Sequence, residues 1–171
     1  MNLILNLKGK TMLRLLVLCC TIMFAQSSFS ASAGQTAPNF KLPGIKTGNL
    51  MSLKSLRGKV VYLDFWASWC GPCRQSLPLL NDLRKELRRK GFEVLAVNLD
   101  EEKSDAKAFL KQFPVSYPVL LDPKGKVPLK YDLPGMPTSY LIDRKGKIRK
   151  VHVGFKKQDM SKIRKEVMSL L

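Results

Sequence analysis

The chain contains one histidine and four cysteines among its 171 residues. A structural zinc site takes four cysteine or histidine ligands, and a disulfide framework takes several cysteines at wide separations. Two of the cysteines lie in the first twenty residues, so beyond them only Cys70, Cys73 and His152 remain. Arg74 follows Cys73, which excludes the Cys-x-x-Cys-His attachment of a c-type haem. These counts exclude a resident zinc site and a structural disulfide framework.

A long apolar run is also missing. The segment 15–25 is apolar, but it has roughly half of the ~20 residues that span a bilayer. Basic residues precede it between positions 8 and 14, and small residues follow it at 31–33. This order is typical of a secretory signal. We therefore predict a signal peptide over residues 1–33 and a single domain over 34–171, with an uncleaved N-terminal membrane anchor as the alternative.

Acidic residues are few, since 13 Asp and Glu stand against 30 Lys and Arg, for a formal net charge of +17. A charge of this size affects encounter and solubility and does not determine the fold. The densest basic cluster, 84–90, suits the solvated C-terminal end of a helix. Alternatively, it steers the protein toward an acidic partner or gives weak contact with an anionic membrane surface. The export signal argues against nucleic acid as a partner, because export separates the chain from it.

Hydrophobic periodicity predicts strands and helices that alternate along the chain and end in a hairpin and a last helix. This order indicates a mixed sheet with helices on both faces. We expect Ser104 to cap its helix, Pro78 to kink its helix, and His152 to be an ordinary strand residue. The expected strands are 40–42, 49–58 (an edge strand and a turn), 60–66, 92–99, 117–121, 138–143 and 148–154, and the expected helices are 71–90, 104–113, 127–131 and 157–171.

The motif Trp-Cys-Gly-Pro-Cys at 69–73 follows the apolar strand 60–66. At this spacing two thiols can face each other and close a disulfide with little movement of the chain. Cys70 falls at the expected start of a helix, where unpaired N–H groups and the helix dipole favour a thiolate. The alternative, a small inert disulfide, explains the flanking motif less well. The sequence therefore predicts a thiol–disulfide oxidoreductase.

A carboxylate and two tryptophans flank this pair. Asp64 lies in the middle of an apolar strand, where burial raises the pKa of a carboxyl and lets it take a proton from Cys73. The alternative is a polar residue at the edge of the strand. We expect Trp66 in the core and Trp69 on the wall of the site, although packing alone is an equal explanation for Trp69.

The segment 64–73 closely resembles the thioredoxins, and Gly-Met-Pro-Thr at 135–138 matches the position of their cis-proline. The lead-in Ala-Pro-Asn-Phe at 37–40 and the additional segment between 100 and 134 resemble the TlpA/ResA branch of exported thioredoxin-like proteins. The resemblance covers essentially all of 35–171. It implies an α/β thioredoxin-like fold with a central mixed sheet flanked by helices, an N-terminal strand extension and a central insertion.

The resemblance also implies roles for the residues of the site. Cys70, on the exposed side, would be the nucleophile, and Cys73, one turn deeper, would resolve the mixed disulfide, so that the pair cycles through a Cys70–Cys73 disulfide. A cis Pro137 would present the backbone of Met136 to an incoming peptide, whereas an ordinary turn proline is the alternative. The implied client-binding residues are Trp69, Gly71, Pro72, Met136, Pro137 and Thr138.

Two positions depart from the branch. Many members have a glutamate where this chain has Ser76, and they often have an asparagine at the position of Asp64. Thioredoxin pairs its aspartate with a lysine in the strand that matches 94–97, and this chain has none there. We therefore expect the pKa of Asp64 to be higher than that of its counterpart in thioredoxin.

The leading interpretation is a periplasmic reductase of disulfides in exported proteins, without a cofactor or a metal. Its clients would be exported proteins such as apocytochrome c or copper-site proteins, and its electron donor would be a membrane protein of the thiol-transporter type. A peroxiredoxin-like peroxidase needs a threonine where this chain has Ala67, which disfavours it. Transient copper(I) binding by the two thiols, as in a copper chaperone, remains an open alternative.

Overall fold

The computed structural model describes residues 31–171, so almost all of the expected signal peptide, including Cys19 and Cys20, lies outside the described residues. No helix of this described part is long and apolar enough to cross a bilayer. In chain order the elements are β1 (Lys41–Pro43), β2 (Leu50–Ser52), η1 (Leu53–Leu56), β3 (Val60–Trp66), α2 (Cys73–Leu87), η2 (Arg88–Lys90), β4 (Phe92–Asn98), α3 (Lys103–Gln112), β5 (Val119–Leu121), α4 (Lys126–Tyr131), β6 (Thr138–Ile142), β7 (Ile148–Val153) and α5 (Asp159–Met168).

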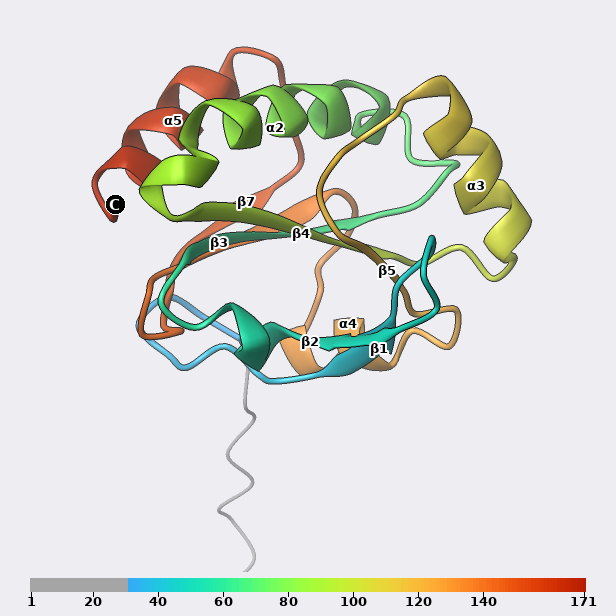
Figure 1. The fold of residues 1–171 in the computed structure, drawn as a ribbon, viewed down its shortest axis with the longest axis horizontal. Coiled ribbons are helices and arrows are strands. Elements are labelled where there is room, and N and C mark those ends of the chain that lie inside the picture. Colours follow the sequence, from blue (N-terminus) through green and yellow to red (C-terminus); the bar gives the residue numbers. More distant parts are fainter. Residues whose placement is uncertain (1–30) are drawn as a thin grey trace, which may run out of the picture.

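The centre of the protein is a five-stranded sheet in the order β5-β4-β3-β6-β7 (Figure 1). Strands β3, β4 and β5 are parallel, whereas β6 and β7 join them antiparallel. Every residue of β3 and β4 is buried, as expected for central strands that are covered on both faces. The expected mixed sheet is therefore confirmed.

Different elements cover the two faces of the sheet. Helices α2 and α5 lie on one face, with α3 toward the β5 side, while the β1–β2 hairpin, η1 and α4 lie on the other (Figure 1). Side chains alternate along β3, so that Tyr62 and Trp66 pack in the core under α2, and Leu63 and Phe65 pack in the second core. Asp64 lies two residues from Tyr62 and two from Trp66, and residues two apart in a strand project to the same face. Its side chain therefore belongs to the α2 face.

The lead-in forms the expected N-terminal strand extension. Segments 40–42 and 49–58 form an antiparallel hairpin, β1–β2, which is a two-stranded sheet of its own, followed by the 3-10 turn η1. Phe40, Leu53 and Leu56 are buried in the second core. The lead-in therefore covers a face of the main sheet, because its apolar side chains are better buried there than at an edge.

The helices begin and end somewhat differently from the sequence pattern. Helix α2 begins at Cys73, with Pro72 at the N-cap position, so Cys70 lies in the turn before the helix and not in its first turn. The helix continues through Pro78, and after η2 the left-handed Gly91, with φ 96°, ends it. Ser104 does not cap α3, because the helix begins one residue earlier and Glu102 occupies the N-cap position.

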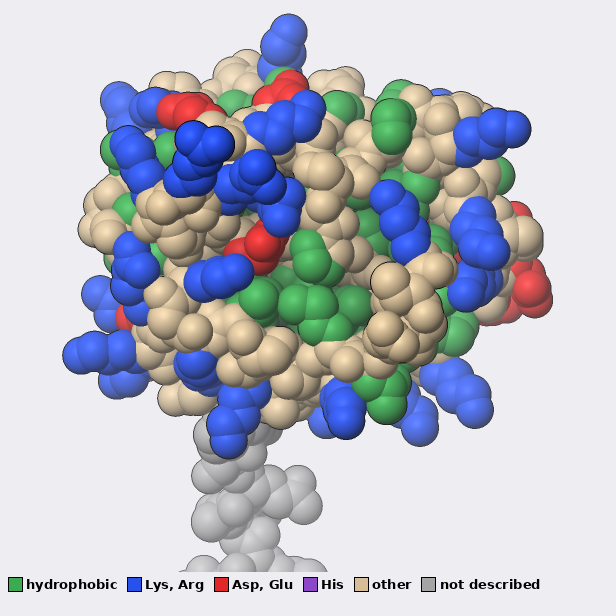
Figure 2. Space-filling view, viewed as in Figure 1, with side chains coloured by type: hydrophobic (Ala, Val, Ile, Leu, Met, Phe, Trp, Pro, Cys, Tyr) green, Lys and Arg blue, Asp and Glu red, His purple; other side chains and the backbone are tan. Residues whose placement is uncertain are grey.

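Basic side chains spread over the surface of the molecule. Figure 2 shows Lys and Arg distributed across the viewed face, with few acidic groups among them. The cluster 84–90 lies at the C-terminal end of α2 and in η2, where Arg84 pairs with Glu93 and Lys85 pairs with Asp82. Most of the cluster is exposed, as expected for the solvated end of a helix, but the Arg84–Glu93 pair is largely buried, with side chains 14% and 9% exposed.

Candidate active site

Cys70 and Cys73 form a disulfide, with 5.3 Å between their Cα atoms. Cys73 is the first residue of α2 and is fully buried, whereas Cys70 is 4% exposed. The expectation that Cys70 lies on the exposed side is therefore only narrowly met. The exposed part of the motif is its rim, since Trp69 is 69% exposed and Gly71 and Pro72 are exposed too.

Two backbone hydrogen bonds shape the turn that holds the disulfide. The Cys70 amide donates to the Ala67 carbonyl at 3.1 Å, and the Cys73 amide donates to the Cys70 carbonyl at 3.2 Å. These tight turns bring the two sulfur atoms together. They also leave the Gly71–Pro72 corner at the surface, so that a partner can approach Cys70 from that side.

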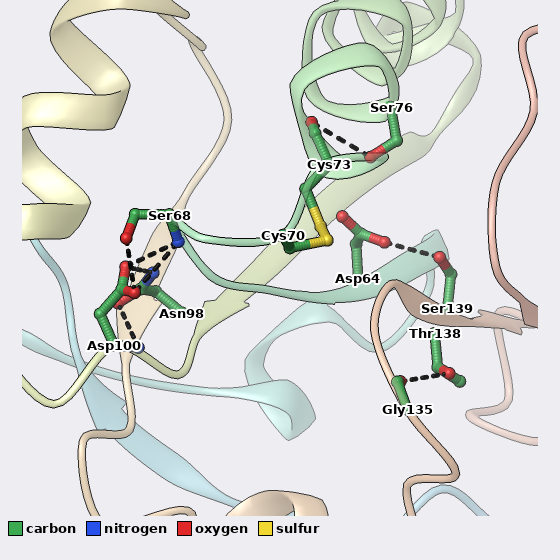
Figure 3. The surroundings of a disulfide bond; sticks show 10 residues. All are labelled: Asp64, Ser68, Cys70, Cys73, Ser76, Asn98, Asp100, Gly135, Thr138 and Ser139. Atoms are coloured by element: carbon green, nitrogen blue, oxygen red, sulfur yellow. Dashed lines mark hydrogen bonds between the residues drawn. A yellow bond between two sulfur atoms is a disulfide. The ribbon is translucent and has the colours of Figure 1, made fainter.

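A buried carboxylate, missed by the sequence analysis, anchors the loop before the disulfide. Asp100 is 3% exposed and accepts hydrogen bonds from the Ser68 amide at 3.0 Å and from the Ser68 hydroxyl at 2.9 Å. The Asn98 amide nitrogen donates to the same carboxylate at 2.7 Å (Figure 3). The sequence offered one signal for this contact. Adjacent parallel strands end at the same edge of a sheet, so an acid just after the strand that ends at Asn98 is expected near the residues that follow the neighbouring strand.

Asp64 is fully buried beside the disulfide. Figure 3 shows its carboxyl between the disulfide and Ser139, whose hydroxyl donates to Asp64 Oδ1 at 2.6 Å. Burial raises the pKa of Asp64 from 3.8 to about 7, and the hydrogen bond from Ser139 only partly opposes this rise. No cation among the described residues contributes to the shift, in agreement with the absence of a lysine from 94–97. The expected buried carboxyl with a raised pKa is therefore present.

The second carboxyl oxygen, Asp64 Oδ2, is buried and has no hydrogen-bond partner among residues 31–171. The position at which related chains have a glutamate is Ser76, which is buried and donates to the Cys73 carbonyl at 3.4 Å. Ser76 thus makes a bond within the helix and carries no titratable group. Asp64 is the carboxyl that Figure 3 shows beside the sulfur atoms.

The peptide bond between Met136 and Pro137 is cis, as the resemblance implied. Strand β6 begins at Thr138, which pairs with Phe65 near the end of β3, so the segment 135–138 lies beside the loop of the disulfide. Thr138 is fully buried, and its hydroxyl donates to the Gly135 carbonyl at 2.7 Å. Thr138 therefore supports this segment from the protein interior, whereas Met136 is only half-buried.

The two tryptophans differ as expected. Trp66 is fully buried and packs against Phe109 with 5.0 Å between the ring centroids. Trp69 projects into solvent at the rim of the motif. Its exposure excludes a pure packing role.

His152 lies in strand β7, as expected, but its side chain also makes contacts that the sequence did not indicate. Its ring contacts two polar groups, the Tyr62 hydroxyl at 2.9 Å and a Glu166 carboxylate oxygen at 2.8 Å. The sequence analysis missed this arrangement, because the three residues come from β7, β3 and α5. No group of three or more metal-binding side chains occurs in the part of the chain that the structure describes.

Comparison with known proteins agrees with this site. The Redoxin family matches residues 32–167. A thiol-disulfide oxidoreductase ResA of Bacillus cereus is 36% identical over 146 residues, which cover 82% of this chain and 84% of that protein. ResA of Bacillus subtilis (strain 168) is 37% identical over 153 residues, which cover 85% of this chain and 84% of that protein.

Solved structures give the same result. A candidate thiol:disulfide interchange protein DsbE from Chlorobium tepidum is 50% identical, with a TM-score of 0.80, and the match covers 82% of this chain and 99% of that one. StoA from Bacillus subtilis is 26% identical, with a TM-score of 0.64, and the match covers 75% of this chain and 96% of that one. The chain therefore belongs to the ResA family of thioredoxin-like thiol–disulfide oxidoreductases, within the Redoxin group.

Proposed function

We propose that this enzyme reduces disulfides of exported proteins in the periplasm, with Cys70 as nucleophile, Cys73 as resolving thiol and Asp64 as proton acceptor. The carrying observation is the Cys70–Cys73 disulfide beside a buried carboxyl with one oxygen left without a partner. An inert structural disulfide needs no such group, and burying a lone carboxyl costs stability. A group retained at that cost is typical of a functional site.

The reaction passes through a mixed disulfide. The Cys70 thiolate attacks a client disulfide and releases the first client thiolate. Cys73 then transfers its proton to Asp64, and the Cys73 thiolate attacks the Cys70 sulfur and releases the second client thiolate. Two electrons pass from the dithiol to the client, and the enzyme is left with the disulfide seen here.

The rim of the site fits a client peptide. Trp69 offers an exposed aromatic surface, and the Gly71–Pro72 corner leaves room beside Cys70. The half-buried Met136, next to the cis Pro137, packs against the core that contains both cysteines. An extended client segment can pair with the backbone at Met136 while its own cysteine meets Cys70.

The remaining assignments rest on the sequence. Residues 1–33 serve as an export signal and 34–171 form the catalytic domain. Clients are exported proteins with paired cysteines, such as apocytochrome c or copper-site proteins, which places the enzyme in cytochrome c biogenesis or a related pathway. A membrane thiol transporter supplies the electrons, and the basic surface gives weak contact with the membrane.

Reduction is the proposed direction because Gly-Pro separates the cysteines, as in thioredoxin. Thioredoxin has a potential of about −270 mV, against about −120 mV for the strongly oxidising periplasmic type. A measured potential near about −270 mV supports a reductase. A value near −120 mV contradicts this direction of exchange.

Trapping in the exporting cell tests the roles and identifies the clients. Cys73→Ala should accumulate mixed disulfides between Cys70 and client proteins, because no second thiol is left to resolve them. Cys70→Ala is the matched control and should accumulate none. Equal trapping by both variants would overturn the assigned roles.

A further inference from the structure

A row of polar side chains crosses the sheet from the disulfide toward the surface. Asp64 on β3 is the register partner of Ser139 on β6, and Ser139 is in turn the register partner of His152 on β7. Residues opposite each other on neighbouring strands project to the same face of a sheet. Three polar side chains thus lie side by side on a face that is otherwise apolar core.

Tyr62 completes the row. It lies two residues before Asp64 on β3, so its side chain projects to the same face. Its hydroxyl is 2.9 Å from His152 Nδ1, and the two rings stack with 5.7 Å between their centroids. Burial raises the pKa of Tyr62 and the neighbouring Ser139 hydroxyl opposes this rise, so Ser139 lies close to both Tyr62 and Asp64.

The far end of the row reaches solvent. His152 Nε2 lies 2.8 Å from Glu166 Oε2, and both side chains are about one-sixth exposed, at 15% and 16%. His152 also lines an open hollow of about 240 Å³. Asp64, at the other end, has no exposed surface. The row therefore connects a buried acid with a solvent-accessible imidazole–carboxylate pair.

The chemistry of each group allows two opposite arrangements of hydrogen bonds. A carboxylate only accepts, so His152 Nε2 donates to Glu166, and a neutral ring then accepts from Tyr62 through Nδ1. With the proton on Asp64, the donors run from Asp64 to Ser139, to Tyr62 and to His152. With the proton on His152, every donor points the other way, so that Ser139 donates to Asp64 Oδ1.

We propose that Ser139, Tyr62 and His152 form a proton relay that carries the proton taken by Asp64 out to solvent beside Glu166. Asp64 gives its proton to Ser139, Ser139 gives its own to Tyr62, and Tyr62 gives its own to His152 Nδ1. The imidazolium so formed is paired with Glu166 and passes a proton to water. No electron moves in the relay, and the reverse shift returns a proton when Cys73 leaves as a thiolate.

Imidazole is suited to the outer end, because one ring nitrogen faces Tyr62 and the other faces Glu166, so a proton can enter at one side and leave from the other. Several charges around it set the balance between the two arrangements. Glu166 favours the imidazolium, as does Asp159, which borders the same hollow from α5, while Lys162 on α5 and Lys150 on β7 oppose it.

This inference rests on the proposed roles of Cys73 and Asp64. Stopped-flow mixing of the reduced enzyme with one equivalent of dithiobis(nitrobenzoate) separates the steps, because attack by Cys70 releases one coloured thiolate and attack by Cys73 releases a second. Near pH 7 about half of the Asp64 carboxyls are protonated. In the wild type the relay exchanges these protons quickly, so we expect the second release to be a single exponential.

Tyr62→Phe removes only the hydroxyl and interrupts the relay. Molecules whose Asp64 is ionised react at once, whereas the others wait for a proton to leave a closed site. We expect the second release to split into two phases, with the slower about tenfold slower or more. The fraction in the slow phase should grow as pH falls through about 7. His152→Gln keeps hydrogen bonding without binding a proton, and it should split the release in the same way.

Tyr117→Phe is the matched control. Tyr117 is a buried tyrosine in the same core whose pKa is also raised, by burial and to a smaller extent by Asp64, but its hydroxyl donates to the Leu77 carbonyl. This variant should keep a single phase. A merely structural effect of losing a hydroxyl slows the whole population and does not produce two phases whose amplitudes follow pH.

The outcomes separate the relay from the function it serves. A single phase of unchanged rate in both Tyr62→Phe and His152→Gln, or a split of equal size in Tyr117→Phe, overturns the relay. If Asp64→Asn instead leaves the rate and the pH dependence of the second release unchanged, the proposed role of Asp64 as proton acceptor is itself wrong. Circular dichroism of each oxidised variant checks that it is folded.

Discussion

Ser139 and Asp64 are register partners on adjacent strands, and the Ser139 hydroxyl donates to Asp64 Oδ1 across 2.6 Å. This bond stabilises the ionised carboxyl, yet complete burial outweighs it and raises the pKa of Asp64 to about 7. The acid beside the disulfide therefore changes its protonation near neutral pH. Asp64 should therefore contribute to the pH dependence of both the resolving step and the stability of the fold.

Removing the Ser139 hydroxyl should shift the pH profile of the resolving step. The rate of attack by Cys73 should rise with pH through about 7 in the wild type, as Asp64 becomes able to accept a proton. Ser139→Ala loses a bond that lowers the pKa of Asp64, so the inflection should move to higher pH. Asp64→Asn should lose the inflection and react about 10- to 100-fold more slowly. Rapid-mixing rates from pH 5 to about 9 measure both effects, and an unmoved inflection in Ser139→Ala contradicts the prediction.

The oxidised enzyme should lose stability as pH rises. In the unfolded chain Asp64 ionises near 3.8, but in the folded protein it keeps its proton up to about 7. The folded state thus binds more protons between these values, so the free energy of unfolding falls across this window and then levels. The three-unit difference corresponds to about 4 kcal/mol at most.

Asp64→Asn tests this effect because an amide does not ionise. Relative to the wild type, the variant should gain stability between about pH 4 and about pH 8, measured by urea unfolding of the oxidised proteins. A difference between the two proteins that is the same at both pH values would show that ionisation of Asp64 is not its source.

Asp100 should be needed to hold the loop before the disulfide. Asp100→Ala leaves the Ser68 amide and the Asn98 side chain without their acceptor, which should cost about 2 to 3 kcal/mol. Hydrogen exchange at the Ser68 amide should become faster. Asp105→Ala, which removes an exposed acid from the first turn of α3, is the control and should change stability by about 0.5 kcal/mol or less. Equal losses in the two variants would argue against a special role for Asp100.

Trp69 should matter for protein clients and little for stability. Its side chain is 69% exposed, so Trp69→Ala should change the free energy of unfolding by about 0.5 kcal/mol or less. Reduction of a protein disulfide should become slower, whereas reaction with a small aromatic disulfide should stay nearly the same. Leu129→Ala, which removes an 81% exposed side chain from α4 on the other face of the sheet, should affect neither reaction. A loss of similar size with both substrates would place Trp69 in the chemistry itself.

Much of the fold and the centre of the site could be predicted from short stretches of sequence. The apolar run 60–66 indicated a central strand, the spacing of the two cysteines indicated a disulfide, and the matching 135–138 indicated a cis-proline. An isolated acid within the apolar run was enough to expect a raised pKa at Asp64. The strand, the disulfide and the raised pKa depend on neighbours within a few residues, whereas the cis-proline was expected from the resemblance to the thioredoxins.

Other features depended on contacts between distant residues. The lead-in became a separate hairpin because the open face of the sheet offered burial to its apolar side chains. The cap predicted at Ser104 was wrong because the first turn of α3 began a residue earlier. The Ser68–Asp100 contact joins two strand ends that are 32 residues apart.

The sequence by itself determined which chemistry the chain can perform, because the paired thiols and the buried acid lie within ten residues of one another on one strand, turn and helix. Only the tertiary structure decided which side chains from other strands lie near Asp64. The Tyr62–His152 contact spans 90 residues and exists because β6 lies between β3 and β7 in one register. Hydrophobic periodicity predicts strands but not their order or register, so it placed His152 in a strand without indicating its contacts with Tyr62 and Glu166.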